Sequence, residues 1–330
     1  MSFTFRAATR EGFGLILGVI GPSGSGKTYS AMRLAKGIAG DGKRFAVIDT
    51  ENGRAKHYAD LFAFDHGALA PPFSPAAYEE AILAADAAGY PVIVVDSFSH
   101  EHAGDGGILD MHEAELTRMA GQDWKKRESC KMAAWIKPKM DHKRMVSKLL
   151  QVRAHLILCL RAEEKIEMAR GADGKLVIQP KRSLTGLNGW IPICEKTLPY
   201  ELTASFLLTP DHPGVPQPIK LQEQHRKLVA LDKPLDEQCG AAIGAWARGT
   251  GASTAENAAP IPTVTDVDLL TQGKFAAMGG TTSVQAWWAN LTKESRASLQ
   301  GERANLKAIA EQADREIETA KADWEATKEQ

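Results

Sequence analysis

One octapeptide near the N-terminus restricts the fold of this chain more than any other feature. The sequence GPSGSGKT at positions 21–28 fits the pattern G-x-x-x-x-G-K-[ST] and follows a continuous apolar run at positions 13–20. Such a run is typical of a strand buried on both faces, and the apolar spacing after Lys27 indicates a helix that ends at Gly40. A glycine-rich loop between a buried strand and a helix holds phosphate groups. We therefore expect a fold that opens with a nucleotide-binding loop.

The alternation of strands and helices continues beyond this loop. Strand-like apolar runs recur at residues 44–49, 91–96 and 155–160, and Ser74-Pro75 opens a helix that ends near Gly89. This order predicts an α/β fold, a P-loop core with a mainly parallel sheet. From about residue 175, the short runs KLVIQP, WIPICEKTL and YELTASFLLTP predict further strands. We expect these to extend the sheet as an antiparallel edge or hairpin.

The C-terminal third of the chain has a different composition. We expect the core to occupy residues 1–220 and a helical extension to occupy 221–248. Residues 249–263 are rich in Gly, Ala, Ser, Thr and Pro, which is typical of a linker, and residues 264–330 predict a helical tail. In that tail, apolar residues spaced 4-3-4-3-4 from Leu306 to Trp324 favour a helix packed on a neighbouring helix. A long coiled coil is the alternative.

The residue types in the loop indicate what it binds. Lys27 is expected to reach the β- and γ-phosphates, and the Thr28 hydroxyl is expected to ligate Mg²⁺. Asp96 ends the apolar run VIVVD, where a carboxylate is the expected second magnesium partner; a simple strand-ending cap is the alternative. The expected cofactors are therefore ATP and Mg²⁺. The nucleotide-binding residues are expected to be Gly21, Pro22, Ser23, Gly24, Ser25, Gly26, Lys27, Thr28 and Tyr29.

A further acidic position follows the second predicted strand, which ends Asp49-Thr50-Glu51. In open α/β sheets, ligands bind at the carboxyl ends of the strands. We therefore expect Glu51 to face the γ-phosphate and to orient or deprotonate the attacking water. The alternative is an acidic loop residue before the Asn52-Gly53 turn.

These motifs together resemble the core of the RecA-type recombinases, whose second strand ends in D-x-E and whose Walker B strand often ends in Asp-Ser; here these are Asp49-x-Glu51 and Asp96-Ser97. More closely, the chain resembles the phage-encoded RecA-like ATPases of single-strand annealing and recombination. The features that carry this are TENGRA at 50–55, the segment 135–150 and the strand that ends in Arg161. The resemblance covers roughly residues 12–210. It implies a RecA-like P-loop core, an ATP-hydrolysing activity and a homo-oligomer.

The resemblance also suggests roles for three basic residues. In RecA-like proteins, the strand end that Arg161 occupies carries a polar sensor of the γ-phosphate, which makes Arg161 a candidate catalytic residue beside Lys27, Glu51 and Asp96. A solvated strand terminus is the alternative. Lys181 and Arg182 follow the VIQP strand, where basic residues of this family can reach the ATP of a neighbouring subunit. An ordinary charged turn is the alternative for these two.

A basic segment lies between residues 125 and 153. It contains ten Lys or Arg residues against only Glu128 and Asp141, in a chain whose net charge is −1. Interleaved Trp124 and Trp135 suit stacking on bases, which contributes roughly 1–3 kcal/mol per base. The alternative is the solvated face of a surface helix. The candidate contacts to single-stranded DNA are Lys125, Lys126, Arg127, Lys137, Lys139, Lys143 and Arg144.

Three functions remain open from the sequence. The first is an ATPase that couples hydrolysis to single-stranded DNA binding in recombination, repair or replication, in a phage or prophage. The second is a nucleotide-gated adaptor, whose helical tail recruits a single-stranded-DNA-binding or replication protein. The third is a P-loop kinase of a small molecule. The four cysteines form no C-x-x-C pair and no signal peptide or membrane span is evident, so we expect a cytoplasmic protein of a bacterial host cell.

Overall fold

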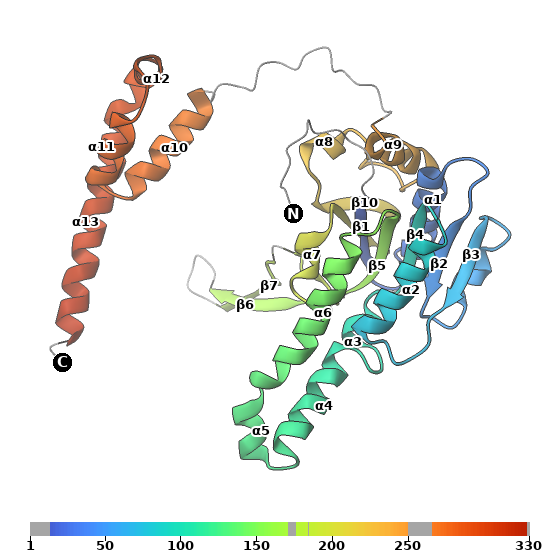
Figure 1. The fold of residues 1–330 in the computed structure, drawn as a ribbon. Helices are drawn as coiled ribbons and strands as arrows, with labels where there is room; N and C mark the ends of the chain where they lie inside the picture. The colour runs from blue at the N-terminus through green and yellow to red at the C-terminus, as the bar shows by residue number, and fades with distance from the viewer. Residues whose placement is uncertain (1–13, 171–175, 184, 250–265, 329–330) are drawn as a thin grey trace, which may run out of the picture. The chain divides into compact units, whose positions relative to one another are not determined.

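The computed structural model describes residues 14–170, 176–183, 185–249 and 266–328. By its contacts the chain divides into two compact units, Met1–Ser253 and Thr254–Gln330. Figure 1 shows the elements of both. Most of the linker predicted at 249–263 lies outside the described residues. The two units are therefore described separately.

The first unit is built on an eight-stranded sheet. Its strands are β1 (Ile16–Gly21), β2 (Phe45–Asp49), β3 (Phe64–Ala68), β4 (Val92–Asp96), β5 (His155–Glu164), β8 (Trp190–Pro192), β9 (Ala204–Thr209) and β10 (His212–Lys220). The strand order is β10-β9-β1-β5-β4-β2-β3, with β8 paired to β5 beside this path. All neighbours along the path are parallel except β10 and β9, and β8 is antiparallel to β5. The α/β fold class with a mainly parallel sheet is confirmed.

One part of the expected topology is wrong. The strand in YELTASFLLTP was expected at an antiparallel edge, but β9 pairs parallel with β1 inside the sheet. All six of its residues are buried, as a strand covered on both faces requires. The antiparallel edge is instead β10, whose sequence HPGVPQPIK contains three prolines that an interior strand would not accommodate.

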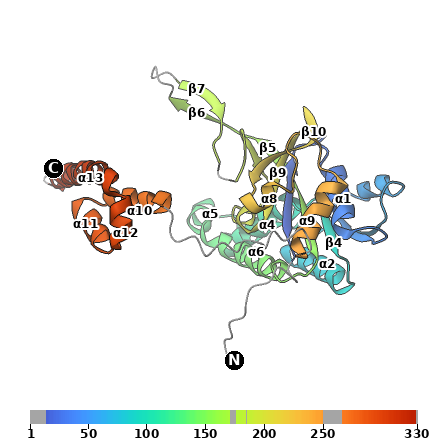
Figure 2. The ribbon, with the colours of Figure 1, turned by 90° about the horizontal axis from the view of Figure 1, so that it is seen from above.

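Two further strands form a separate hairpin. β6 (Ile166–Arg170) and β7 (Leu176–Pro180) pair antiparallel with each other in a two-stranded sheet of their own. Figure 2 shows this hairpin extending away from the main sheet. Four of its apolar side chains are exposed, namely Ile166, Met168, Leu176 and Ile178. The strand predicted from KLVIQP is therefore confirmed, but the expectation that it extends the main sheet is wrong, because it pairs only with β6.

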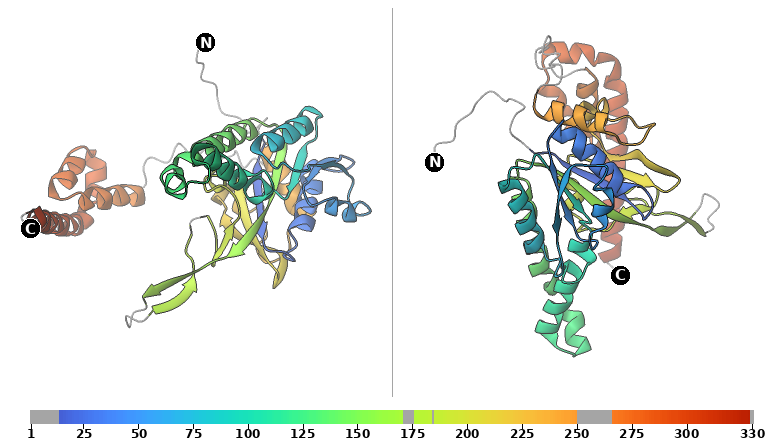
Figure 3. Two further views of the ribbon diagram at one scale, coloured as in Figure 1. Left: turned by 90° about the horizontal axis from the view of Figure 1, so that it is seen from below. Right: turned by 90° about the vertical axis from the view of Figure 1, so that its right-hand side faces the viewer.

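Helices cover both faces of the sheet, as Figure 3 shows. On one face, α1 (Lys27–Ala39) packs against α9 (Glu237–Ala247); on the other, α2 (Pro75–Ala87) packs against α6 (Ile136–Leu149). Each pair covers its own hydrophobic core. The remaining helices of this unit are η1 (Arg54–Tyr58), α3 (His100–Ala103), α4 (Ile108–Ala120), α5 (Trp124–Cys130), η2 (Ala133–Trp135), α7 (Leu198–Glu201) and α8 (Glu223–Arg226).

The residues just before α1 and α2 explain why these two predicted helices begin where they do. α1 begins directly after the glycine-rich loop and ends before Gly40, as predicted. α2 begins at Pro75 because the side chain of Ser74 accepts a hydrogen bond from the Ala77 N–H at 3.3 Å. Proline suits this first helical position because the N–H that it lacks would have no partner there.

The second unit is a small helical assembly. Its elements are α10 (Asp266–Met278), α11 (Thr281–Ala289), α12 (Lys293–Ser298), η3 (Gln300–Glu302) and α13 (Arg303–Lys328). The helices enclose a core of Ala277, Val284, Leu306 and Ala310, against which Trp287 and Trp288 pack. Leu306 and Ala310 begin the 4-3-4 spacing, so its first turns pack inside this unit, as the sequence favoured.

Candidate nucleotide site

The loop between β1 and α1 is shaped by glycines in positions that other residues would not tolerate. Gly24 and Gly26 have φ angles of 79° and 84°, in the left-handed region that disfavours L side chains. A Cβ on Gly21 would lie 2.3 Å from the Leu208 carbonyl oxygen, too close for any residue but glycine. The buried Ser25 hydroxyl donates to the Pro22 carbonyl at 2.9 Å and ties the loop together. The backbone N–H groups of such a loop bind phosphate oxygens.

Lys27, Thr28 and Asp96 lie together at the base of this loop. The Lys27 ammonium donates to the Pro22 carbonyl at 2.7 Å, and its burial lowers the pKa of this lysine. The Thr28 hydroxyl donates to Asp96 Oδ2 at 2.5 Å, across the gap between α1 and the end of β4. Asp96 is only 7% exposed, and burial raises its pKa to about 6. A hydroxyl and a buried carboxylate side by side are hard oxygen ligands that fit Mg²⁺.

The end of β2 positions Glu51 through the buried Asp49. Asp49 Oδ1 accepts from the Glu51 N–H at 2.6 Å, and Asp49 Oδ2 accepts from the Ala55 N–H at 2.9 Å. Between them, Asn52 and Gly53 have φ angles of 57° and 82°, so the chain reverses tightly and enters η1. Asp49 therefore fixes the turn that carries Glu51, a positioning role that the sequence pattern alone did not assign.

Arg161 comes from β5, the neighbour of both β1 and β4. In the register of the parallel pair β1–β5, Arg161 lies opposite Gly21, the first residue of the loop. Its backbone N–H donates to the Ser99 hydroxyl at 2.8 Å, which ties β5 to the segment after Asp96. The strand order thus brings Arg161 to the same edge of the sheet as Glu51 and Asp96.

Glu51 makes two ion pairs at this edge. Arg161 Nη2 donates to Glu51 Oε1 at 2.6 Å, and Arg54 Nη1 donates to Glu51 Oε2 at 2.8 Å. Burial alone would raise the pKa of Glu51, but the hydrogen bonds from Arg161 and Arg54 outweigh it and hold that pKa below its usual value. Glu51 is therefore a carboxylate in the physiological range.

The side chains expected to act on the nucleotide line one hollow of about 610 Å³, whereas Gly21 and Ser25 of the loop do not line it. Arg54, Tyr58, Ala162 and Ile193 also line it and were not predicted from the sequence. Arg54 had one detectable signal, since it lies three residues after Glu51; the others are brought in by the fold alone. The lining residues are Pro22, Ser23, Gly24, Gly26, Lys27, Thr28, Tyr29, Glu51, Arg54, Tyr58, Asp96, Arg161, Ala162 and Ile193.

The basic segment forms α5, η2 and α6, and acidic residues of other elements pair with part of it. Lys137 pairs with Glu115 at 3.0 Å and Lys139 with Glu195 at 3.6 Å. Ion pairs also join Arg127 to Glu113 and Arg144 to Asp141. Trp124 is 71% exposed, whereas Trp135 stacks on His112 with the ring centroids 4.0 Å apart.

Three candidate DNA contacts differ from the others. Lys125, Lys126 and Lys143 are exposed and make no ion pair with the described residues. Lys181 and Arg182 lie exposed at the foot of the β6–β7 hairpin and do not line the nucleotide hollow of their own chain. The functional roles of all these residues stay predictions. Among the described residues, no group of three His, Cys, Asp or Glu side chains is arranged to hold a metal.

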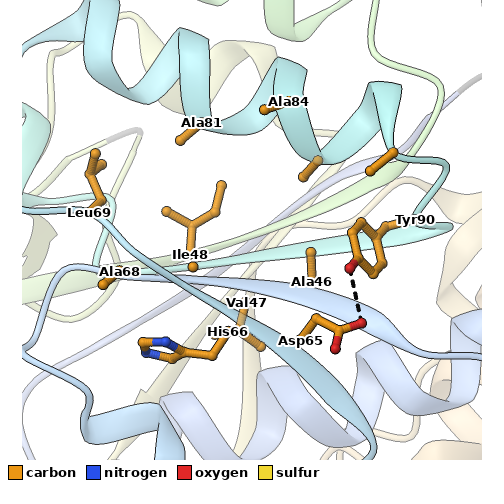
Figure 4. Close-up of a pocket in the computed structure, with 13 residues that line it drawn as sticks. Ala46, Val47, Ile48, Asp65, His66, Ala68, Leu69, Ala81, Ala84 and Tyr90 are labelled. Atoms are coloured by element: carbon orange, nitrogen blue, oxygen red, sulfur yellow. Dashed lines mark hydrogen bonds between the residues drawn. The ribbon is translucent and has the colours of Figure 1, made fainter.

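A second hollow lies beneath α2 and is unrelated to the nucleotide site. Figure 4 shows it between the alanine-rich face of α2 and the strands β2 and β3. Its volume is about 350 Å³, and Tyr90 closes one end by donating from its hydroxyl to Asp65 at 2.9 Å. None of its lining residues also lines the nucleotide hollow.

The fold and the site together define an α/β P-loop protein that binds a nucleotide. The chain matches the family model of the AAA domain over residues 14–191, more than half of its length, and it belongs to that family. Members of this family are in general ATPases, so the general class of this chain is a nucleotide-binding P-loop ATPase. Comparison with curated proteins gives no significant match. Within the described parts of the chain, every helix is too short or too polar to cross a membrane.

Proposed function

We propose that this protein is a RecA-like ATPase of a phage or prophage that couples the hydrolysis of Mg²⁺-ATP to single-stranded DNA binding in recombination, repair or replication. The observation that carries the proposal is the position of Glu51. It lies in the same hollow as Lys27, Asp96 and Arg161, at the carboxyl edge of the sheet. A carboxylate at that point can accept a proton from a water molecule that attacks the γ-phosphate, which supports hydrolysis.

Each residue of the hollow has a distinct task in this proposal. The loop N–H groups and Lys27 bind the phosphates, and Thr28 and Asp96 hold Mg²⁺, which neutralises charge on the phosphate oxygens when bound. Glu51 accepts a proton from the water that attacks the γ-phosphorus. Arg161, whose guanidinium is planar and always charged, donates to the γ-phosphate as charge develops there.

The hydrolysis step is tested with Glu51→Gln. The change removes the proton acceptor but keeps the side chain's size, so hydrolysis should fall about a hundredfold or more while ATP binding remains. Phosphate release measured with and without single-stranded DNA checks this. Glu223→Gln, which alters an exposed ion pair with Arg226 outside the basic segment, serves as the matched control. ATP binding without hydrolysis in the unaltered protein would favour the nucleotide-gated adaptor instead, and phosphate transfer to a nucleoside would favour the kinase.

The DNA-binding part rests on three of the candidate contacts, Lys125, Lys126 and Lys143, which are exposed and make no ion pair with the residues that the structure describes. A cation already paired to a carboxylate has less to gain from a phosphate than an unpaired one. We therefore infer that Lys125, Lys126 and Lys143 contribute more than Arg127, Lys137, Lys139 and Arg144. Basic side chains displace counterions, so each lost phosphate contact should reduce the salt dependence of log K by about 0.7 for a single strand.

The test compares two triple charge reversals by fluorescence anisotropy. Lys125, Lys126 and Lys143 changed to Glu should weaken single-stranded DNA binding strongly and flatten its salt dependence. Lys43, Arg226 and Lys227 changed to Glu make the same change of net charge elsewhere on the unit and should have a small effect. Equal losses in the two variants would remove the basic segment from the DNA site.

Two features of the assembly complete the proposal. The protein acts as a homo-oligomer, in which Lys181 and Arg182 of one copy approach the nucleotide of the next, and its second unit binds a single-stranded-DNA-binding or replication protein. The exposure of Lys181 and Arg182 outside their own nucleotide hollow supports the first feature. Sedimentation with ATP, and ATPase rates of mixtures of Lys27→Ala and Arg182→Ala chains, test it. Mixing should restore activity only if the two residues act across an interface.

A further inference from the structure

Both oxygens of the Glu51 carboxylate are engaged by arginines. Arg161 occupies Oε1 at 2.6 Å and Arg54 occupies Oε2 at 2.8 Å. A carboxylate that takes a proton from water needs an oxygen to which that water can donate. The Glu51 side chain is only 16% exposed, so little of it remains open to a third partner. Although each oxygen could accept a second hydrogen bond, release of one arginine would open a Glu51 oxygen fully to the attacking water.

The two arginines are not equivalent candidates for release. Arg54 lies three residues after Glu51 on the turn that Asp49 fixes, so it moves with Glu51. Arg161 belongs to a different strand and lies opposite Gly21 at the start of the phosphate-binding loop. Its guanidinium can donate two parallel hydrogen bonds to a phosphate, which a carboxylate in a shared ion pair matches less well. Arg161 is thus the arginine that a phosphate can withdraw.

We propose that Glu51, Arg161 and Arg54 form a latch that the γ-phosphate opens. A nucleoside triphosphate draws Arg161 away from Glu51 and frees Oε1 for the attacking water, while Arg54 stays on Oε2 and orients the carboxylate. A diphosphate does not reach Arg161 and leaves the latch closed. Arg54 is in this scheme a positioning residue, which acts through Glu51. The inference rests on the proposed hydrolysis at this site, but its decisive consequence concerns binding.

Breaking the Glu51–Arg161 pair then costs free energy, which weakens the binding of a triphosphate. In Glu51→Gln the charge that holds Arg161 is gone, so the arginine is available to the γ-phosphate at lower cost. A triphosphate should bind more tightly to this variant, and a diphosphate should not. Simple repulsion between Glu51 and the γ-phosphate predicts the same tightening. The two explanations differ when Arg161 is absent, because repulsion persists there and the latch does not.

The experiment is a double-mutant cycle read by isothermal titration calorimetry. ADP and a non-hydrolysable ATP analogue are titrated, with Mg²⁺, into the unaltered protein, Glu51→Gln, Arg161→Gln and the double variant. The latch predicts that Glu51→Gln tightens analogue binding about tenfold in the natural background and less than twofold in the Arg161→Gln background, with ADP affinity constant throughout. Equal tightening in both backgrounds overturns the latch. Arg226→Gln, on an exposed ion pair with Glu223, is the control for the arginine change.

Because this readout needs no hydrolysis, it separates failure of the latch from failure of the proposed function. A protein that binds the analogue and does not hydrolyse ATP still reports on the latch.

The positioning role of Arg54 has its own readout, the dependence of kcat on pH. The charged and titratable groups around Glu51 are Arg54, Arg161, Lys27, Asp96, His100 and Cys159. Removing the Arg54 cation raises the pKa of Glu51, so Arg54→Gln should move the acidic limb of the kcat–pH profile to higher pH and lower kcat with little change in KM. Arg54→Lys should restore the position of the limb. An unchanged limb in Arg54→Gln, with the fold intact by circular dichroism, would exclude the role.

Discussion

Polar side chains that line the nucleotide hollow differ in their partners from those at the opposite, amino ends of the strands. In the hollow at the carboxyl ends, Glu51 and Asp96 bind other side chains, namely Arg161, Arg54 and Thr28, although Asp49 beside them binds backbone. At the amino ends, polar side chains bind backbone. The Leu15 N–H donates to His155 Nδ1 at 3.1 Å, the Ile16 N–H to Thr203 Oγ1 at 3.2 Å, and the N–H groups of Arg153 and Ala154 to Asp86 Oδ1 at 3.1 and 2.9 Å.

This difference separates function from stability within one sheet. A side chain that satisfies a backbone group near the core cannot leave it without exposing an unpaired donor, which costs about 1–3 kcal/mol. An ion pair between two partly exposed side chains is worth much less, so a charged ligand can compete for either partner. Polar residues at the amino ends should therefore affect folding, and those that line the nucleotide hollow at the carboxyl ends should affect nucleotide binding and turnover.

The largest expected effect comes from Lys27→Ala at the carboxyl end. Loss of the ammonium that reaches the phosphates should weaken ATP binding about a hundredfold or more, since charge-assisted contacts to phosphate are lost. Stability should change little, because the pKa of Lys27 is already lowered by burial and its removal takes away an unfavourable buried cation. Calorimetric titration and urea unfolding measure the two quantities. Lys36→Ala, an exposed change on the same helix, is the control.

A second prediction concerns the amino end and pH. Burial lowers the pKa of His155 to about 4, against a usual value near 6.5. A histidine with a depressed folded-state pKa adds stability above pH 6.5 that is lost as pH falls toward 4, because the unfolded chain takes up the proton first. The loss amounts to at most about 3 kcal/mol.

His155→Gln should flatten the fall in stability between pH 6.5 and 4, since glutamine still offers an acceptor to Leu15 but does not titrate. Urea unfolding across this pH range is the measurement. His212→Gln, at an exposed position on β10, should leave the fall in place. Weaker ATP binding in a folded His155→Gln protein would contradict the claim that polar residues at the amino ends of the strands affect stability alone.

The smallest effect is expected at Asp86. Asp86→Ala leaves the N–H groups of Arg153 and Ala154 without their acceptor, and stability should fall by about 1 kcal/mol. Asp86→Asn keeps one acceptor oxygen and should be nearly neutral. Thermal unfolding distinguishes the two changes, and the ATP affinity of both variants should equal that of the unaltered protein. A large loss in Asp86→Asn would mean that charge, and not hydrogen bonding, is what matters there.

The parts of the molecule that the sequence predicted well are those that local pattern determines. β1, β4 and β5 are continuous apolar runs, and the loop before α1 has a fixed spacing of glycines. By contrast, β3 was missed because its sequence FDHGA is neither apolar nor alternating; it forms by pairing with β2. The direction of β9 was also wrong, since an apolar run carries no information about which way a strand enters a sheet.

The same limit applies to charge. Counting along residues 125–153 gives a strongly basic segment, yet Glu113, Glu115 and Glu195 come from other elements and pair with three of its cations. A count along the chain cannot include carboxylates that folding brings from elsewhere. Arg54 shows that folding also adds functional residues that a count misses. It pairs with Glu51 and lines the nucleotide hollow because of the turn that Asp49 fixes.

β5 has a mechanical consequence of its own. Up to Leu160 the strand is fully buried and clamped between β1 and β4, whereas from Ala162 to Glu164 it pairs with β8 and then leads into the β6–β7 hairpin. Arg161 stands at the boundary between the clamped and the outer part. A strand is nearly inextensible, with a rise of about 3.3 Å per residue. A shift of Arg161 along the strand axis would therefore be passed on to the residues paired with β8 and to the start of β6 with little loss of length.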